Sequence, residues 1–591
     1  EENAGTSNSL FADVNGKLIN FKDAYTTHVI KKVKNYKGEE VAFGNFDAHG
    51  WQYKGPINVN GAWTNTANTV AGMQWAPDVI YNKTMKKWCM YMSLNGDYWC
   101  STIVCFTSDD LEGPWVYQGP VICGGFSGKF GHNGYAAADD WKNTDLTIAT
   151  GCTSLPARYA TPGDAYGAHW GEYWPNCIDP CVFYDDDDNL WMSYGSWSGG
   201  IFMIRLDNTN GLRDYTYTFP YQINGVDAIP GSYNQACTSD PYFGKKIAGG
   251  YYVSGEASYI QKVGKYYYLF MSYGGLTSDG GYQMRIFRSE NPDGPYVDCY
   301  GTSALFKSYK MNYSSTTADN RGVLLFGGYQ WDAMSGAELA QGHNSAFVDK
   351  QNRSFVVYHT RFSNGGEGHQ VRVHQLFLND EGWLMAAPFE FDGETITDAA
   401  IASKASIADA DIAGDYQFMR HQYGQNTKAK AFETPVNITL NADGTITGAE
   451  KGTWKRTAGT DYIHLTINNV VYRGVLVKQT VDYTNIPAIA ISALSSSSGS
   501  LTMGQSNFTY QQEVWAVKAD AKAAIKYTLS KMTLPFSDGA TLNAVSSLPT
   551  QGNMGAKISW KSSNPSILTD DGKVKGKGKV TLTMTISKDE Y

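Results

Sequence analysis

The segment DPCVFYDDDDNLWMSYGS (179–196) decides the fold. Two runs rich in aromatic and β-branched residues stand on either side of a short polar run of aspartates. This pattern predicts two strands joined by a turn. The second strand ends in small residues, and similar strands recur as GEEVAFGN (38–45), KKWCMYMSLN (86–95), KYYYLFMSYGG (265–275) and RSFVVYHTRF (353–362).

In four of the five copies the preceding strand can also be recognised, at 75–82, 179–186, 257–264 and 344–351. Each recurring strand is therefore predicted to be the second strand of a hairpin. Radially repeated antiparallel hairpins indicate a β-propeller, and five copies predict five blades. A β-sandwich is the alternative, and the repeat argues against it.

The sequence changes character near residue 400. Residues 399–413 are rich in Ala, Asp and Ile, which suggests a linker or a short helix. Apolar and polar residues then alternate from 437 to 478, and a further strand is expected at 511–518, so a small β-barrel or β-sandwich is predicted here.

The whole chain is therefore predicted to be all-β, with three domains. They are a five-bladed propeller at 10–398, an accessory barrel or sandwich at 412–520 and an immunoglobulin-like β module at 522–591. We expect the natural chain to continue beyond Tyr591 and its mature N-terminus to follow a processing site.

Composition limits the classes of partner. The net charge of −9 argues against nucleic acid, which binds proteins with a basic face. With 14% aromatic and 18% charged residues, the chain suits a neutral glycan. No apolar run approaches the roughly 18 residues of a membrane-spanning helix. The nine cysteines are an odd number without a CxxC metal pattern, and they do not settle the compartment.

Four segments resemble glycoside hydrolase family 43, and in particular its arabinanase branch: WAPDVIYN (75–82), NCIDPCVFYDDDDNLWMSYGSWSGGIFMIRLD (176–207), YYYLFMSYGGLTSDGGYQMRIFRSENPDGPY (266–296) and GHNSAFVDKQNRSFVVYHTRF (342–362). The resemblance implies an inverting hydrolase of α-1,5-linked L-arabinofuranosyl bonds in plant cell-wall arabinan. We expect endo action, a monomer, and a secreted, cell-surface or periplasmic location in a bacterium. An exo-acting arabinofuranosidase or xylosidase is the alternative within the enzymes.

The resemblance also assigns two carboxylates. Glu256, in YYVSGEASYI, occupies the position of the general acid, which protonates the leaving oxygen. Asp179, which opens a strand before Pro180, occupies the position of the pKa modulator. Relatives usually show Glu-Gly-Pro where this chain has Glu-Ala-Ser.

The general base is less clear, because the family's Asp-Pro of the first blade is missing from KDAYTTHVIKKV (22–33). Asp23 is predicted as the base, and Asp47 and Asp13 are alternatives. A threonine at this position cannot accept a proton at neutral pH. If no base is present, the chain is a catalytically impaired carbohydrate-binding protein on the same fold.

In related arabinanases a histidine at the position of His343 contacts a metal ion at the propeller centre. The expected ion is calcium, with sodium as an alternative, coordinated mostly by water. A core histidine is the competing interpretation. Substrate contacts are predicted from aromatic and polar residues in or beside the matched segments: Trp75, Trp197, Tyr194, Ser196 and Asn133.

Overall fold

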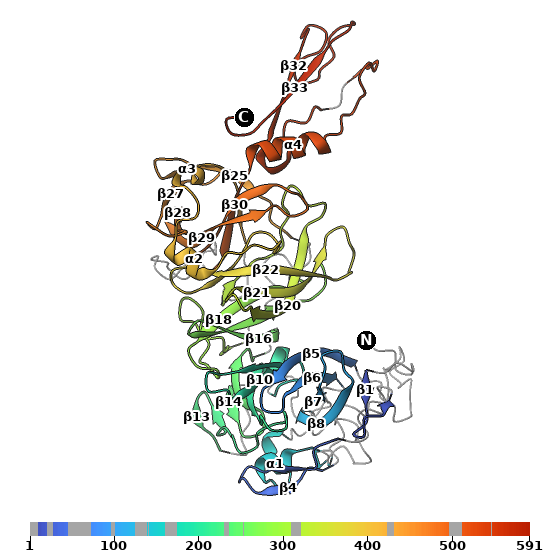
Figure 1. Cartoon of the computed structure of the whole chain (residues 1–591), viewed down its shortest axis with the longest axis vertical. Helices are drawn as coiled ribbons and strands as arrows, with labels where there is room; N and C mark the ends of the chain where they lie inside the picture. Colours follow the sequence, from blue (N-terminus) through green and yellow to red (C-terminus); the bar gives the residue numbers. More distant parts are fainter. Residues whose placement is uncertain are drawn as a thin grey trace. The chain divides into compact units, whose positions relative to one another are not determined.

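The computed structural model describes residues 10–19, 28–44, 73–95, 101–124, 139, 141–142, 144–159, 174–229, 236–251, 253, 255–308, 321–421, 431–495, 511–544 and 547–591. Strands dominate it, which confirms the all-β class (Figure 1). The chain forms two compact units. Unit 1 comprises residues 1–274, 284–322 and 342–344, and unit 2 comprises 275–283, 323–341 and 345–591.

The first sheet of unit 1 has the strand order β2-β1-β8-β7-β6-β5. Its strands are β1 (Phe11–Ala12), β2 (Leu18–Ile19), β5 (Met73–Asn82), β6 (Lys87–Asn95), β7 (Ser101–Ser108) and β8 (Trp115–Cys123). A separate hairpin pairs β3 (Lys32–Lys34) with β4 (Glu40–Ala42).

The second sheet has the order β13-β12-β14-β15-β11-β10-β9, and the third contains β16, β17 and β18 in that order. The strands are β9 (Cys181–Tyr184), β10 (Leu190–Tyr194), β11 (Ile201–Leu206), β12 (Gln222–Ile223), β13 (Val226–Asp227), β14 (Cys237–Asp240), β15 (Gly244–Ala248), β16 (Glu256–Val263), β17 (Tyr266–Tyr273) and β18 (Gln283–Ser289). Short helical turns are α1 (Leu146–Thr150), η5 (Ala157–Tyr159) and η6 (Trp197–Gly199).

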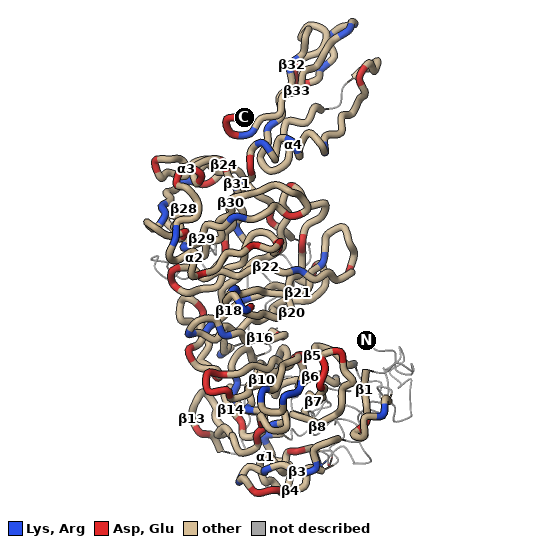
Figure 2. Tube along the Cα trace, in the orientation of Figure 1, with Lys and Arg blue, Asp and Glu red and all other residues tan. Residues whose placement is uncertain are grey.

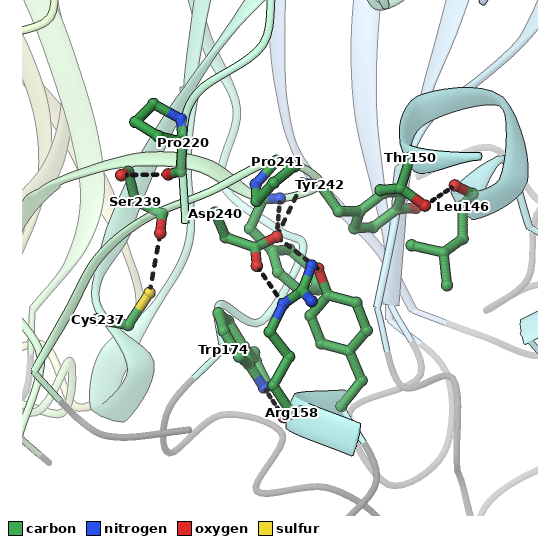
Figure 3. Close-up of polar contacts among 12 residues, drawn as sticks. Leu146, Thr150, Arg158, Trp174, Pro220, Cys237, Ser239, Asp240, Pro241 and Tyr242 are labelled. Carbon is green, nitrogen blue, oxygen red and sulfur yellow. Dashed lines mark hydrogen bonds and ion pairs between the residues drawn. The ribbon is translucent and has the colours of Figure 1, made fainter. Parts of the chain in front are cut away.

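A buried polar network around Asp240 stabilises the second sheet of unit 1 (Figure 3). Asp240, at the end of β14, forms an ion pair with Arg158 Nε at 2.8 Å and accepts the backbone N–H of Tyr242 at 2.8 Å. The hydroxyl of Tyr159 donates to the same carboxylate at 2.5 Å. Because these charges are paired and hydrogen-bonded, their burial is tolerated, and the network serves the fold.

Unit 2 contains β19 (Val323–Leu324) and a sheet of the order β20-β21-β22-β23. These strands are β20 (Glu338–Val348), β21 (Ser354–Phe362), β22 (Gln370–Leu378) and β23 (Leu384–Ala386); residues 342–344 of β20 belong to unit 1. The predicted second strands thus occur in hairpins, since β5–β6, β9–β10, β16–β17 and β20–β21 are each paired.

A closed eight-stranded barrel follows, so the barrel alternative is confirmed for the accessory domain. Its strands are β24 (Gly414–Arg420), β25 (Val436–Leu440), β26 (Thr445–Gly448), β27 (Gly452–Arg456), β28 (Tyr462–Ile467), β29 (Val470–Thr480), β30 (Pro487–Ser495) and β31 (Glu513–Ala519). Two short helices, α2 (Asp398–Ser403) and α3 (Asp409–Ile412), precede it where a linker or helix is predicted.

The C-terminal segment of unit 2 contains α4 (Ala521–Lys531), η7 (Asn553–Gly555) and the strand pair β32 (Lys557–Ser562) and β33 (Leu582–Ser587). The side chain of Asp520 caps α4 by accepting the N–H of Ala523 at 2.8 Å. Within the described ranges, no helix is both long and apolar enough to cross a membrane.

Candidate active site

The carboxylate of Asp179 lies at the start of the strand that carries Glu256. Its Oδ2 accepts the backbone N–H of Ala257 at 3.1 Å, and Glu256 is the first residue of β16. Asp179 and Ala257 both adopt a left-handed backbone conformation, each with φ of 54°. Since this conformation is strained for residues other than glycine, the surrounding structure must hold it in place.

The pKa of Asp179 depends on two other predicted functional residues, Glu256 and His343. Burial raises the pKa of the Asp179 carboxyl to about 6, and the negative charge of Glu256 adds to the rise. The imidazole of His343 and the N–H of Ala257 act in the opposite direction. The structure therefore brings Asp179, Glu256 and His343 together.

The loop after β10 holds the Glu256 carboxylate. Trp197 Nε1 donates to Glu256 Oε2 at 2.6 Å, and Ser196 Oγ donates to the same oxygen at 3.3 Å. The backbone N–H of Trp197 donates to Gly255 O at 2.8 Å, and Trp197 itself has φ of 53°. Trp197 and Ser196, predicted to contact substrate, thus contact the candidate acid.

His343 lies on β20 and is half-buried. Its φ is 45°, and its backbone N–H donates to Ser272 Oγ at 2.8 Å. No group of three or more His, Cys, Asp or Glu side chains able to hold a metal ion occurs among the residues that the structure describes. Calcium prefers six to eight oxygen ligands, so an ion beside His343 and Asp179 fits only with water as its main ligand.

Of the three candidate bases, the structure describes Asp13. Asp23, Asp47 and the predicted sugar ligand Asn133 lie outside the described residues. Asp13 lies in the turn between β1 and β2, where its Oδ1 accepts the N–H groups of Asn15 at 2.9 Å and Lys17 at 3.0 Å. Asp13 therefore stabilises a local turn.

Two aromatic residues with the same predicted role differ in exposure. Trp75 lies on β5 with 40% of its surface exposed, as a sugar-stacking residue requires. Tyr194 is 0% exposed, packs in the core of unit 1 and donates its hydroxyl to Phe243 O at 2.7 Å. The prediction that Tyr194 contacts substrate is wrong, because its side chain is fully buried in the core.

Asp78 is the last residue of the WAPD motif, and no role was predicted for it from the sequence. Its Oδ2 accepts the N–H of Val182 at 2.7 Å and its Oδ1 that of Val79 at 2.9 Å, so it ties β5 to β9. Burial raises the pKa of the Asp78 carboxyl to about 7, against the effect of these two hydrogen bonds. Asp78 is thus an ionisable group between the first strands of two neighbouring sheets.

Family models match three regions of the chain. The family model described as glycosyl hydrolases family 43 matches residues 130–384. A C-terminal lipocalin-like domain matches residues 388–504, and an atrophied bacterial Ig domain matches 521–591.

Two curated proteins are similar over most of their length. An extracellular endo-α-(1→5)-L-arabinanase of Thermotoga petrophila is 35% identical over 71% of this chain and 76% of its own. The extracellular endo-α-(1→5)-L-arabinanase 2 of Bacillus subtilis is 34% identical over 68% of this chain and 73% of its own. The crystal structure of endo-1,5-α-L-arabinanase from Thermotoga petrophila in complex with TRIS is 34% identical, with a TM-score of 0.57, and the match covers 77% of this chain and 85% of that one.

Proposed function

Since this chain belongs to glycosyl hydrolases family 43 and is a glycoside hydrolase, we propose that it is an endo-acting, inverting α-1,5-L-arabinanase that cleaves plant cell-wall arabinan. The observation that carries the proposal is the place of the Asp179 carboxylate at the start of β16: it accepts the N–H of Ala257, the residue after Glu256, and the charge of Glu256 helps to raise its pKa. The similarity to two extracellular arabinanases supports the choice of substrate.

The roles follow from what inversion requires. Glu256 protonates the oxygen of the leaving sugar, and a water molecule attacks the opposite face of the ring under general-base catalysis. Asp179 supplies a neighbouring negative charge that disfavours early loss of the acid's proton. Asp23 is the proposed base. Trp75, Ser196, Trp197 and Asn133 remain the proposed contacts of the sugar chain.

We further propose a five-bladed propeller made of the four sheets that begin with β5, β9, β16 and β20, completed by the β3–β4 hairpin region. The protein acts outside the bacterial cell as a monomer. Lys and Arg are interspersed with Asp and Glu along the described parts of both units (Figure 2), which suits an uncharged polymer.

The proposed ion lies beside His343 and is calcium, coordinated mainly by water. Treatment with a chelator is expected to lower the rate, and added calcium is expected to restore it. A thermal unfolding curve recorded in parallel tests binding independently of activity, because an ion that binds only the folded state raises Tm. Identical curves with and without calcium would contradict the site.

The proposed activity is tested by incubating the protein with linear, debranched and branched arabinan and following reducing ends and product sizes. Oligosaccharides should appear from linear arabinan and be absent with Glu256→Ala. Glu290→Gln is the control, because it removes an exposed carboxylate of unit 1 that forms an ion pair with Lys265. Release of arabinose alone would indicate exo action. No release from arabinan, aryl arabinosides or aryl xylosides would leave a carbohydrate-binding protein.

A further inference from the structure

Three buried serines occupy the same place in three successive sheets of unit 1. Ser93 lies on β6, Ser193 on β10 and Ser272 on β17, each on the second strand of its hairpin and each directly after a methionine. All three are 0% exposed. The repeat of a Met-Ser pair at this position is visible in the sequence, but the strand pattern alone gives it no role.

Each serine contacts a residue in, or two residues before, the first strand of the following sheet. Ser93 Oγ accepts the backbone N–H of Asp179 at 3.0 Å. Ser272 Oγ accepts the backbone N–H of His343 at 2.8 Å. The three hydroxyls thus form a series that passes from one sheet to the next, and two of them end on predicted functional residues.

Ser193 also contacts a residue of the following sheet. Ser193 Oγ lies 3.0 Å from Ser258 Oγ, and Ser258 is two residues after Glu256 on β16. Ser272, in turn, is the strand partner of Glu256 within the third sheet. Asp179 and His343 are therefore each bonded to one of these serines, and Glu256 is the strand partner of Ser272.

The backbone explains why a hydroxyl is needed. Asp179 and His343 have left-handed conformations, with φ of 54° and 45°, which turn their N–H groups away from regular strand pairing. A buried N–H without an acceptor costs free energy, so the serine oxygen stabilises a backbone conformation that would otherwise relax. This conformation sets the direction in which the side chains of Asp179 and His343 leave the strand.

We propose that Ser93, Ser193 and Ser272 are positioning residues that hold Asp179, Glu256 and His343 in their reactive arrangement through hydrogen bonds to the beginning of the next sheet. The proposal rests on the proposed function, because it assigns these serines to the same hydrolytic site. None of the three touches the sugar, and each acts through the residue that it holds.

The test compares Ser93→Ala and Ser272→Ala with Ser239→Ala. Ser239 is a buried serine of unit 1 whose Oγ donates to Pro220 O at 2.6 Å (Figure 3), so its removal costs a comparable hydrogen bond away from the site strands. All three variants should lose similar thermal stability. Only Ser93→Ala and Ser272→Ala should lose kcat on linear arabinan, by about 10- to 100-fold, with KM changed by less than about 3-fold.

Two further arms separate positioning from folding. Ser93→Thr keeps the hydroxyl and should recover much of the kcat that Ser93→Ala loses. Hydrogen–deuterium exchange, read by mass spectrometry on peptides that contain Asp179 and His343, should be faster in Ser93→Ala and Ser272→Ala respectively, and unchanged in Ser239→Ala. The exchange readout does not depend on the substrate.

The outcomes distinguish the two proposals. If the wild-type protein cleaves arabinan and the alanine variants keep its kcat while losing only stability, the serines serve the fold alone and the inference is overturned. If the wild type cleaves none of the substrates, the proposed function fails, and unchanged exchange at Asp179 and His343 would overturn the serine contacts as well.

Discussion

Unit 1 and unit 2 both bury carboxyl groups, and they surround them differently. In unit 2, Glu513 of β31 accepts Trp515 Nε1 at 2.9 Å, the N–H of Ala386 at 3.1 Å and the hydroxyl of Ser492. Burial raises the pKa of Glu513 to about 8, although these donors oppose the rise. These neutral donors satisfy the buried carboxyl, and all of them belong to unit 2.

Asp179 of unit 1 has charged neighbours instead. It faces a second carboxylate, Glu256, and the imidazole of His343, and burial brings its pKa to about 6. The strand that carries Glu256 is also irregular, because β16 contains a register shift between Glu256 and Tyr259. The described strand pairs of the unit 2 barrel run without such a shift. Burial alone therefore does not distinguish the two carboxyls; what distinguishes Asp179 is the combination of the charge of Glu256, the imidazole of His343 and a bulge in the strand that carries Glu256.

The largest test of this comparison replaces one carboxyl in each unit by its amide. Asp179→Asn should lower kcat on linear arabinan by about 100-fold or more, since it removes the charge beside the candidate acid. Glu513→Gln should leave kcat near the wild-type value, because the hydrogen bonds of its carboxyl join barrel strands and β23 within unit 2. If both variants lost kcat equally, measured per mole of folded protein, the proposed difference between Asp179 and Glu513 would be wrong.

A smaller effect is expected from the two tryptophans that donate to these carboxyls. Trp197→Phe removes the 2.6 Å hydrogen bond to Glu256, and kcat should fall about 10-fold, as is typical for a hydrogen bond to a charged group. Trp515→Phe removes the equivalent donor to Glu513 and should lower Tm without lowering kcat of the folded enzyme. A rise in KM with unchanged kcat in Trp197→Phe would assign the indole to substrate binding.

Stability should depend on pH through unit 2. Glu513 and Glu338 have folded pKa values of about 8 and about 7, raised by burial from the ordinary 4.5. The folded state therefore holds these protons more tightly than the unfolded chain. The stabilisation is complete below about pH 4.5 and is lost as pH rises toward about 8.

We expect the Tm of the wild type to fall by several degrees more between about pH 5 and about pH 8 than that of Glu513→Gln, which has no proton to lose. Asp179→Asn serves as the comparison from unit 1. Its own carboxyl is lost, but Glu513 and Glu338 remain, so its Tm should retain most of the wild-type slope above about pH 6. Parallel curves for the wild type and Glu513→Gln would refute the assignment to Glu513.

Strand positions were predictable because each hairpin repeats the same local pattern of apolar residues and turn. The grouping of Asp179, Glu256 and His343 was also predictable, through the resemblance of their motifs. The contacts of Trp197 and the serines were not, because they join residues of different sheets and depend on left-handed backbone at Asp179 and His343. Tyr194 was misassigned because its place in a matched segment does not show that both faces of β10 are buried.

The smallest expected effect separates the two aromatic residues that the sequence placed together. Trp75 is exposed on β5, opposite Ser93 in the strand register, so Trp75→Ala should raise KM for arabino-oligosaccharides about 5-fold with little change in kcat. Tyr194→Phe removes only the buried hydrogen bond to Phe243 and should lower Tm while KM stays constant. If Tyr194→Phe changed KM and Trp75→Ala did not, Tyr194 rather than Trp75 would contact the sugar chain. The proposed substrate site would then have to be rebuilt around β10.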